Sequence, residues 1–133
     1  MSDPFKIERL TSRHQFLAAA KGVSEARGAV VVQRLDRQDG VDTVRLGFTA
    51  TRKVGNAVIR NRAKRRLREA ARATAPLLAV PGSDYVFIAR MGTADRPWDR
   101  LLDDVKSALT RLATPRPALK SAPTQPAPAG QDS

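Results

Sequence analysis

The chain has 133 residues, and its 24 lysines and arginines outnumber 13 aspartates and glutamates, which gives a net charge of +11. This length suits one domain of ordinary size, and so large a positive excess is typical of a protein that binds a polyanion, either nucleic acid or an anionic membrane surface. The lack of cysteine excludes a disulfide framework, a thiol nucleophile and a thiolate zinc site, and the single histidine, His14, cannot build a multi-histidine metal site. We therefore expect neither catalytic side chains nor metal ligands on this protein.

The first half of the chain predicts a short helix followed by two strands. Residues 12–21 can form a helix in which Ser12 caps the first turn and Gln15 completes a capping box. Residues 29–35 are apolar and β-branched, which is typical of a strand. A polar turn then leads to a second predicted strand over residues 43–51.

The strand over residues 43–51 alternates between two chemically different sides. One side is apolar and comprises Val44, Leu46, Phe48 and Ala50. The other is small, polar and partly basic and comprises Arg45, Gly47, Thr49 and Thr51, followed by Lys53. Small residues would let a nucleotide chain approach closely, so this side can border a groove; an ordinary solvent-facing strand side explains the pattern equally well.

The second half of the chain predicts a long helix, a strand and a last helix. The long helix runs from its N-cap Asn56 to about Thr74, because Pro76 ends the pattern. Residues 85–90 predict a strand, and residues 97–112 predict an amphipathic helix. The order α-β-β-α-β-α predicts an α+β fold in which helices pack on a small sheet.

Residues 113–133 differ in composition from the rest of the chain. They hold five of the nine prolines and no aromatic residue. Such a segment cannot bury enough apolar surface to offset the entropy lost on ordering, so we expect a Pro/Ala-rich disordered tail after a folded domain over residues 1–112. The tail adds one net positive charge, from Arg116 and Lys120 against Asp132, so the domain itself carries the basic character.

The long helix and the turn before it hold most of the positive charge. Residues 52–72 carry nine basic side chains against one acid, Glu69. At ~100° per residue, one stripe would face the sheet, formed by Ile59, Ala63, Leu67, Ala70, Ala71 and Thr74. On the opposite side like charges recur at i,i+4 spacing, which destabilises an isolated helix. Phosphate groups would supply the missing counter-charge, so the helix favours nucleic acid as the partner.

A role on a membrane or in the DNA major groove suits this helix less well. A helix lying on a membrane needs a broad face of large apolar residues, whereas this apolar stripe is mostly alanine. A helix that reads the DNA major groove commonly follows a short helix and turn, and none is predicted here. No apolar run approaches the ~20 residues of a membrane span, and the N-terminus lacks the features of a secretory signal. We therefore expect a soluble cytoplasmic protein with no membrane partner.

The segment RLGFTATRKVGNAVIRNRAKRRLREAAR, residues 45–72, resembles the bacterial ribonuclease P protein subunit family. The centre of the match is the Arg-Asn-Arg motif at residues 60–62, followed by Lys64-Arg65 and Arg68. Further matches are Arg9-Leu10, Phe16 and residues 84–90. The resemblance therefore extends in order over residues 9–112.

The resemblance implies a fold that the pattern alone does not define. Members of the family are two-layer α/β sandwiches with three helices, and the same fold occurs in the second domain of a small-subunit ribosomal protein. Their sheet has about four strands, so a fourth strand is expected near residues 22–25. A left-handed βαβ crossover would run through the basic helix.

The resemblance also implies a function. The chain would be the accessory protein subunit of a ribonucleoprotein endonuclease, and it would bind the catalytic ribonuclease P RNA and assist removal of the 5′ leader from precursor tRNA. No obligate protein partner is implied. Mg²⁺ would be held chiefly by the RNA, where it could activate the attacking water, so the protein needs no catalytic side chain and no metal site.

The charge pattern and the resemblance together assign two groups of residues. The RNA-binding group is Arg52, Lys53, Arg60, Asn61, Arg62, Lys64, Arg65, Arg68 and Arg72. The group that would border a cleft for the single-stranded leader is Phe16, Thr49, Thr51, Lys53 and Arg90. An aromatic ring at Phe16 could stack on a base, although a core position on the first helix explains it equally well.

A protein of another class would share the charge and the size. A basic ribosomal-type protein, or an RNA chaperone without a processing role, is the main alternative. The Arg-Asn-Arg block, together with the strand before it, favours the ribonuclease P subunit. A protein-only nuclease would need catalytic side chains that we do not expect here.

Overall fold

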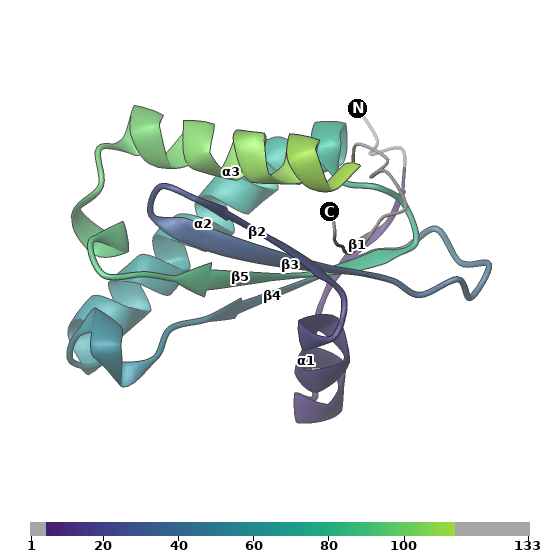
Figure 1. Ribbon diagram of the computed structural model, residues 1–133, viewed down its shortest axis with the longest axis horizontal. Helices are drawn as coiled ribbons and strands as arrows, with labels where there is room; N and C mark the ends of the chain where they lie inside the picture. The colour runs from purple at the N-terminus through teal and green to yellow at the C-terminus, as the bar shows by residue number, and fades with distance from the viewer. Residues whose placement is uncertain (1–4, 114–133) are drawn as a thin grey trace, which may run out of the picture.

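The computed structural model describes residues 5–113, which form five strands, three α-helices and two short 3₁₀ turns (Figure 1). In chain order the elements are β1 (Ile7–Arg9), α1 (Arg13–Ala20), β2 (Val23–Arg27), β3 (Val30–Asp36), β4 (Val44–Thr49), η1 (Arg52–Val54), α2 (Ala57–Leu78), β5 (Ser83–Ala89), η2 (Thr93–Asp95) and α3 (Trp98–Ala113). Apart from Ala113, the predicted tail lies outside the described residues, so its disorder stays a prediction.

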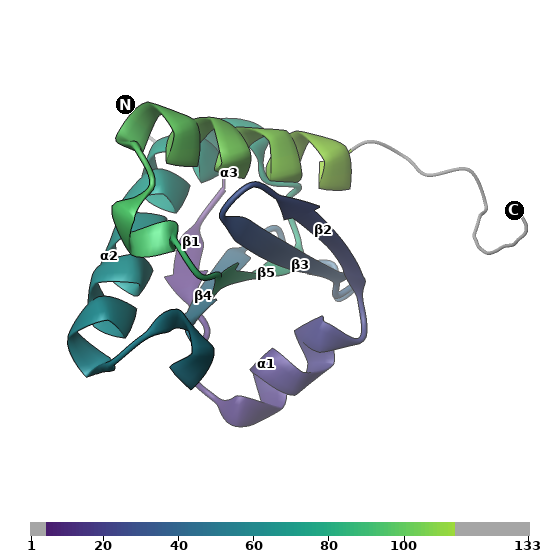
Figure 2. The same cartoon turned by 60° about the vertical axis from the view of Figure 1, so that its left-hand side comes forward.

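The five strands form one sheet in the order β1-β4-β5-β3-β2. Strands β1, β4 and β5 are parallel to one another, whereas β3 and β2 each run antiparallel to their neighbours. Helices α2 and α3 cover one face of the sheet, and α1 lies against the other face (Figure 1 and Figure 2). Helix α2 joins the parallel neighbours β4 and β5, so a βαβ crossover through the basic helix is present. The predicted α+β sandwich is confirmed.

The two predicted helix caps are present. The hydroxyl of Ser12 accepts a hydrogen bond from the backbone N–H of Gln15, and Oε1 of Gln15 accepts from the backbone N–H of Ser12. Oδ1 of Asn56 accepts from the backbone N–H of Ile59 at 3.0 Å. Both helices therefore begin where short-range side-chain chemistry places them.

Other element ends differ from the prediction. Helix α2 does not end at Pro76 but continues to Leu78, because proline near a C-terminus removes a single N–H and the next turn still closes through Ala79. Strand β2 appears close to where the resemblance implied a fourth strand. Strand β1 was not predicted, since three residues are too few to show a pattern, and it brings the sheet to five strands.

The sheet packs against apolar side chains on both faces. The main core lies between the sheet and the helices α2 and α3, and Tyr85 and Phe87 of β5 are its largest fully buried side chains. Helix α2 contributes mostly alanines, which let its backbone approach the sheet closely. A smaller cluster lies under α1 and comprises Leu10, Ala19 and Val86 with the partly buried Phe16, Leu35 and Ile88.

A buried carboxylate joins the loop after β3 to strands β4 and β5. Asp84, at the start of β5, accepts hydrogen bonds from Arg45 of β4 at 2.7 and 2.8 Å and from Arg37 at 2.8 Å. The side chains of Asp84 and Arg37 are 2% and 8% exposed, so losing one partner would leave buried charge uncompensated. Burial alone would lower the pKa of Arg37, but hydrogen bonds to Asp39 and Asp84 outweigh it and raise that pKa. Arg45 therefore has a structural role.

Tyr85 offers a test of this packing because it is the only tyrosine in the chain. It is fully buried, and its hydroxyl accepts a hydrogen bond from the backbone N–H of Val80 at 2.9 Å. Burial raises the pKa of the Tyr85 phenol above its ordinary value of about 10. As the pH rises, the Tyr85 phenol ionises in the unfolded chain before it ionises in the folded protein. The contribution of the protonated phenol to the free energy of unfolding is therefore complete below pH ~10 and is lost as the pH rises through the folded-state pKa.

We therefore expect the ultraviolet absorbance of phenolate to appear at a higher pH in the folded protein than in the urea-unfolded chain. The variant Tyr85→Phe is the control and should show no phenolate signal. Equal midpoints in the two states, with native circular dichroism retained in the folded sample, would contradict the buried position of this ring.

Candidate RNA interface

Most of the basic side chains between residues 52 and 72 have no acidic partner. Within residues 5–113, no ion pair links a carboxylate to any of them. Eight also lack a hydrogen bond to the rest of the described protein: Arg52, Lys53, Arg60, Arg62, Lys64, Arg65, Arg68 and Arg72. The one acid of this segment, Glu69, is exposed and pairs with none of them. The positive charge of α2 and η1 is therefore not neutralised by the described part of the protein.

The ninth basic residue, Arg66, has a structural role. Its guanidinium donates hydrogen bonds to the carbonyl oxygens of Thr93 and Ala94 at 2.8 and 2.9 Å, and to that of Arg96. These carbonyls belong to η2 and the residue that follows it, so Arg66 fastens the connection between β5 and α3 to the side of α2. Arg66 was not in the predicted RNA-binding group. Its residue type and its position in the sequence gave no sign of the contact with η2.

The buried face of α2 agrees with the predicted apolar stripe except at its start. Its buried residues are Ala63, Leu67, Ala70, Ala71, Thr74 and Ala75. Ile59 is 38% exposed, because its side chain lies over Gly55 at the start of the helix and not over the sheet. The stripe therefore fixes how α2 is rotated against the sheet, and with it the direction of the basic residues.

The predicted RNA-binding residues form two groups by exposure. The exposed group is Arg52, Lys53, Asn61, Arg62, Arg65 and Arg72. The half-buried group is Arg60, Lys64 and Arg68. These three recur at four-residue spacing on one flank of α2, and Arg68 places that flank beside β4 because its Cζ atom lies 5.8 Å from the centre of the Phe48 ring. The structure thus brings the group together along one helix and its leading turn.

The turn before α2 fixes where this surface begins. Val54 is buried, and Gly55 has a φ of +150°, a conformation that side chains rarely adopt. Asn56 then caps the helix. As a result Arg52 and Lys53 are held in an exposed 3₁₀ turn at the N-terminus of α2. Backbone geometry therefore explains Val-Gly-Asn at residues 54–56, within the segment that resembles the family.

Phe16 lies on the opposite face of the sheet from α2. Its ring covers Gly47 of β4 so closely that a β-carbon on Gly47 would lie 2.7 Å from two ring carbons and 2.9 Å from Leu10. The ring also belongs to the small cluster under α1, yet it remains partly exposed. Phe16 therefore packs on the sheet and still presents part of its ring. The side of β4 that we expected to border an open groove is covered at Gly47.

The other predicted cleft residues gather at one end of the sheet. Strands β4 and β5 are parallel neighbours in which Thr49 is paired with Ile88, so Thr49 and Arg90 leave the sheet at the same end. Thr51 and Lys53 follow Thr49 into η1, and both are exposed. Thr51 and Lys53 therefore lie just before the N-terminus of α2, whereas the guanidinium of Arg90 reaches the carbonyl oxygen of Gly28, in the turn between β2 and β3, at 3.5 Å.

The chemistry of this surface is that of binding. In the described part of the chain, His, Cys, Asp and Glu form no group of three that could hold a metal ion. None of the helices described there is long and apolar enough to cross a membrane. The surface offers guanidinium donors, positive charge and a partly exposed aromatic ring, which are the groups that bind phosphates and bases. An α+β fold with this surface defines a nucleic-acid-binding protein.

Comparison with known proteins identifies the family. The sequence model of the ribonuclease P family matches residues 5–113. The ribonuclease P protein component of Caulobacter vibrioides is 63% identical over 108 residues, covering 81% of this chain and 72% of its own, and that of Ruegeria pomeroyi is 50% identical over 113 residues, covering 84% and 90%. The RNase P protein of Thermotoga maritima has a TM-score of 0.67 at 30% identity, covering 77% of this chain and 96% of its own. The chain therefore belongs to the ribonuclease P protein family and is a protein subunit of that endoribonuclease.

The contact between Phe16 and Gly47 can be tested by substitution. We expect Gly47→Ala to lower the free energy of unfolding by about 1–3 kcal/mol, because the added methyl group must displace the ring or Leu10. Denaturant unfolding measures the loss. In a Phe16→Ala background the same change should cost much less, which a double-mutant cycle reports as coupling between the two sites. Additive losses would show that the ring does not rest on Gly47.

Proposed function

We propose that this subunit binds the catalytic ribonuclease P RNA through α2 and η1, and contacts the 5′ leader of precursor tRNA at the end of the sheet near Phe16. The observation that carries the proposal is the set of eight basic side chains without an acidic or hydrogen-bonding partner in residues 5–113. A ribosomal-type protein or an RNA chaperone would share the charge, but the family match does not favour either.

The basic surface suits RNA phosphates. The exposed guanidinium groups of Arg62 and Arg65 present several donors in a fixed plane, which matches two oxygens of one phosphate. Each contact would release a counterion from the RNA, so affinity should depend steeply on salt. Mg²⁺ would be held chiefly by the RNA and would activate the water that cleaves the phosphodiester, and the protein would contribute binding and orientation.

The leader would occupy the surface where β4 and β5 end. A single strand is commonly held by stacking and by backbone charge. The exposed part of the Phe16 ring can take a base, while Lys53 and Arg90 can take phosphates and Thr49 and Thr51 can donate hydroxyl hydrogen bonds. We expect this processing to take place in the cytoplasm.

The direct test is reconstitution. The full chain is combined with a bacterial ribonuclease P RNA at low Mg²⁺, and cleavage of precursor tRNA is followed. We expect the protein to restore cleavage at the 5′ end of the mature sequence, and we expect the protein without RNA to cleave nothing. Tight RNA binding without restored cleavage would instead support an RNA chaperone.

Removing a charge from α2 should weaken RNA binding more than removing a charge elsewhere on the protein. We expect Arg65→Gln to weaken binding and to reduce the slope of log affinity against log salt by about one, because one phosphate contact is lost. Lys106→Gln removes one charge from α3, where Lys106 lies near Arg27 of β2 at the far edge of the sheet. Titrations at several salt concentrations should give this control variant the same RNA affinity and the same salt slope as the unsubstituted protein. Equal slopes for both variants would exclude Arg65 from the interface.

The partly exposed ring should favour the leader-bearing substrate. Stacking is worth ~1–3 kcal/mol per base. We therefore expect Phe16→Ala to weaken the binding of precursor tRNA roughly tenfold more than the binding of mature tRNA in the assembled holoenzyme. Leu17→Ala is the control on the same helix, because Leu17 is 54% exposed and should affect both substrates little. An equal loss for both tRNAs, together with lower folding stability, would mean that Phe16 serves only as packing.

A further inference from the structure

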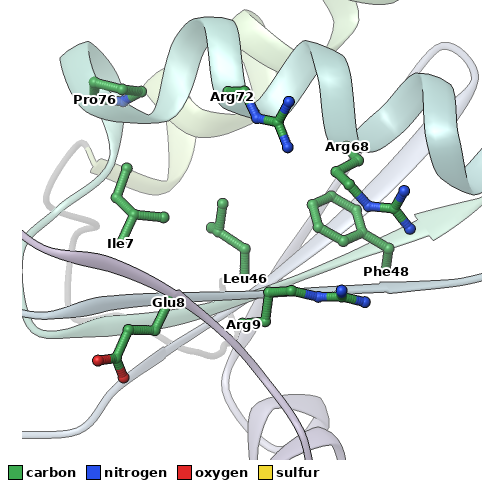
Figure 3. Close-up of a pocket in the computed structure, with 8 residues that line it drawn as sticks. All are labelled: Ile7, Glu8, Arg9, Leu46, Phe48, Arg68, Arg72 and Pro76. Atoms are coloured by element: carbon green, nitrogen blue, oxygen red, sulfur yellow. The ribbon is translucent and has the colours of Figure 1, made fainter.

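A set of buried hydrogen bonds lies where β5 leaves the sheet, and none of the roles described so far uses it. It is separate from the pocket of about 390 Å³ beside α2, which Arg68 and Arg72 line and which belongs to the basic surface already described (Figure 3). The centre of the set is Thr93 in η2, which is fully buried. Its polar groups contact α2, the end of β5 and the turn between β2 and β3.

Thr93 binds both backbone polar groups of Arg90. The N–H of Arg90 donates to Oγ1 of Thr93 at 2.8 Å, and the N–H of Thr93 donates to the carbonyl oxygen of Arg90 at 3.0 Å. The second bond closes a tight turn in which Gly92 has a φ of +94° and a ψ of −12°, values typical of the third residue of a type II turn. Because both groups are bound, the direction in which the Arg90 side chain leaves the backbone is fixed.

The hydroxyl of Thr93 also ties Arg90 to the turn between β2 and β3. Its single hydrogen goes to the carbonyl oxygen of Ala29 at 2.6 Å, because the carbonyl of Arg90, at 2.8 Å, already accepts from the Thr93 N–H. The turn is held from its other side, since the N–H of Ala29 donates to the buried carboxylate of Asp104 of α3 at 3.0 Å. Nη1 of Arg90 lies 3.5 Å from the carbonyl oxygen of Gly28 in the same turn. The hydroxyl therefore joins the backbone of Arg90 to the turn that its guanidinium reaches.

A third contact of Thr93 links Arg90 to α2. The carbonyl oxygen of Thr93 accepts a hydrogen bond from the guanidinium of Arg66 at 2.8 Å. Figure 2 shows the connection from β5 to α3 passing beside α2. Arg66 is on the same helix as the exposed Arg62 and Arg65, so the position of Arg90 relative to these residues is set through one buried side chain.

The guanidinium of Arg90 is available to a ligand. Arg90 is exposed, and no carboxylate within residues 5–113 pairs with it. A group that is held in place before its ligand arrives loses less conformational entropy on binding. The contacts of Thr93 therefore favour binding by Arg90 without touching the ligand.

We propose that Thr93 is a positioning residue for leader binding, because it holds Arg90 in a fixed place relative to α2. Arg90 can then meet the 5′ leader while α2 holds the catalytic RNA. This role rests on the proposed function, which assigns Arg90 to the leader. Thr93 is fully buried and touches no RNA, so removing its hydroxyl should act on the leader through Arg90.

The hydrogen bonds are tested on the full chain without RNA, by amide hydrogen exchange followed with NMR. Thr93→Val keeps the shape of the side chain and removes the hydroxyl, whereas Thr93→Ser keeps the hydroxyl. We expect the Arg90 amide to exchange roughly tenfold faster in Thr93→Val and near its original rate in Thr93→Ser. The Ala29 amide should stay protected in both variants, because Asp104 still binds it, and this shows that they remain folded. Unchanged exchange at Arg90 in Thr93→Val would overturn the proposal.

The effect on the leader is measured in the assembled holoenzyme, as the ratio of the affinities for precursor and mature tRNA. We expect Thr93→Val to lower this ratio several-fold and Thr93→Ser to preserve it. Arg90→Gln should lower it to a similar extent, and adding Thr93→Val to Arg90→Gln should lower it no further. The matched control is Thr74→Val, because Thr74 is also buried and its hydroxyl also donates to a backbone carbonyl, that of Ala70 at 2.8 Å. This control should keep the original ratio.

The possible failures are distinguishable. If Arg90→Gln lowers the ratio and Thr93→Val does not, Arg90 reaches the leader without Thr93, and the proposal fails while the proposed function stands. If neither variant lowers the ratio, the assignment of Arg90 to the leader is wrong and the role of Thr93 falls with it. Additive losses in the double variant would show that Thr93 acts apart from Arg90, which also overturns the proposal. Thr93→Ala removes the same hydroxyl and repeats the test if Thr93→Val does not fold.

Discussion

Helix α2 carries like charges on successive turns and is held in place by the burial of a narrow alanine-rich face. Repulsion at i,i+4 spacing disfavours such a helix in isolation, so its stability comes from packing on β4 and β5. Ala63, Ala70 and Ala71 are completely buried and let the helix lie close to the sheet. The same rotation that buries these residues turns Arg62 and Arg65 outward, so the fold and the binding surface follow from one packing arrangement.

The basic residues behind the net charge of +11 do not all have the same role. Some arginines are held by carboxylates in the protein: Arg37 and Arg45 bind the buried Asp84, and Arg96 binds Asp104 at 2.9 Å. These pairs join the sheet to its loops and to α3. The two acids of these pairs, Asp84 and Asp104, are therefore occupied away from α2. What remains is a helix whose positive charge is free to act on a polyanion, which agrees with membership of the ribonuclease P protein family.

Local signals in the sequence predicted part of this structure, and long-range contacts decided the rest. Caps at Ser12 and Asn56 depend on residues within one turn, so they could be predicted. The role of Arg45 could not, because its partner Asp84 is 39 positions away. The same holds for Arg66, whose carbonyl partners lie in the connection before α3. Short strands such as β1 leave no pattern and form because a neighbouring strand is available.

The account depends on RNA lying against the uncompensated side of α2, and site-directed crosslinking tests this most directly. The chain has no cysteine, so single-cysteine variants can carry a photo-crosslinker at a chosen site. Val58 is 75% exposed on the first turn of α2, and Ser24 is exposed on β2 at the far edge of the sheet. We predict that V58C crosslinks to ribonuclease P RNA in the holoenzyme and that S24C does not. Crosslinks from S24C in place of V58C would contradict the account.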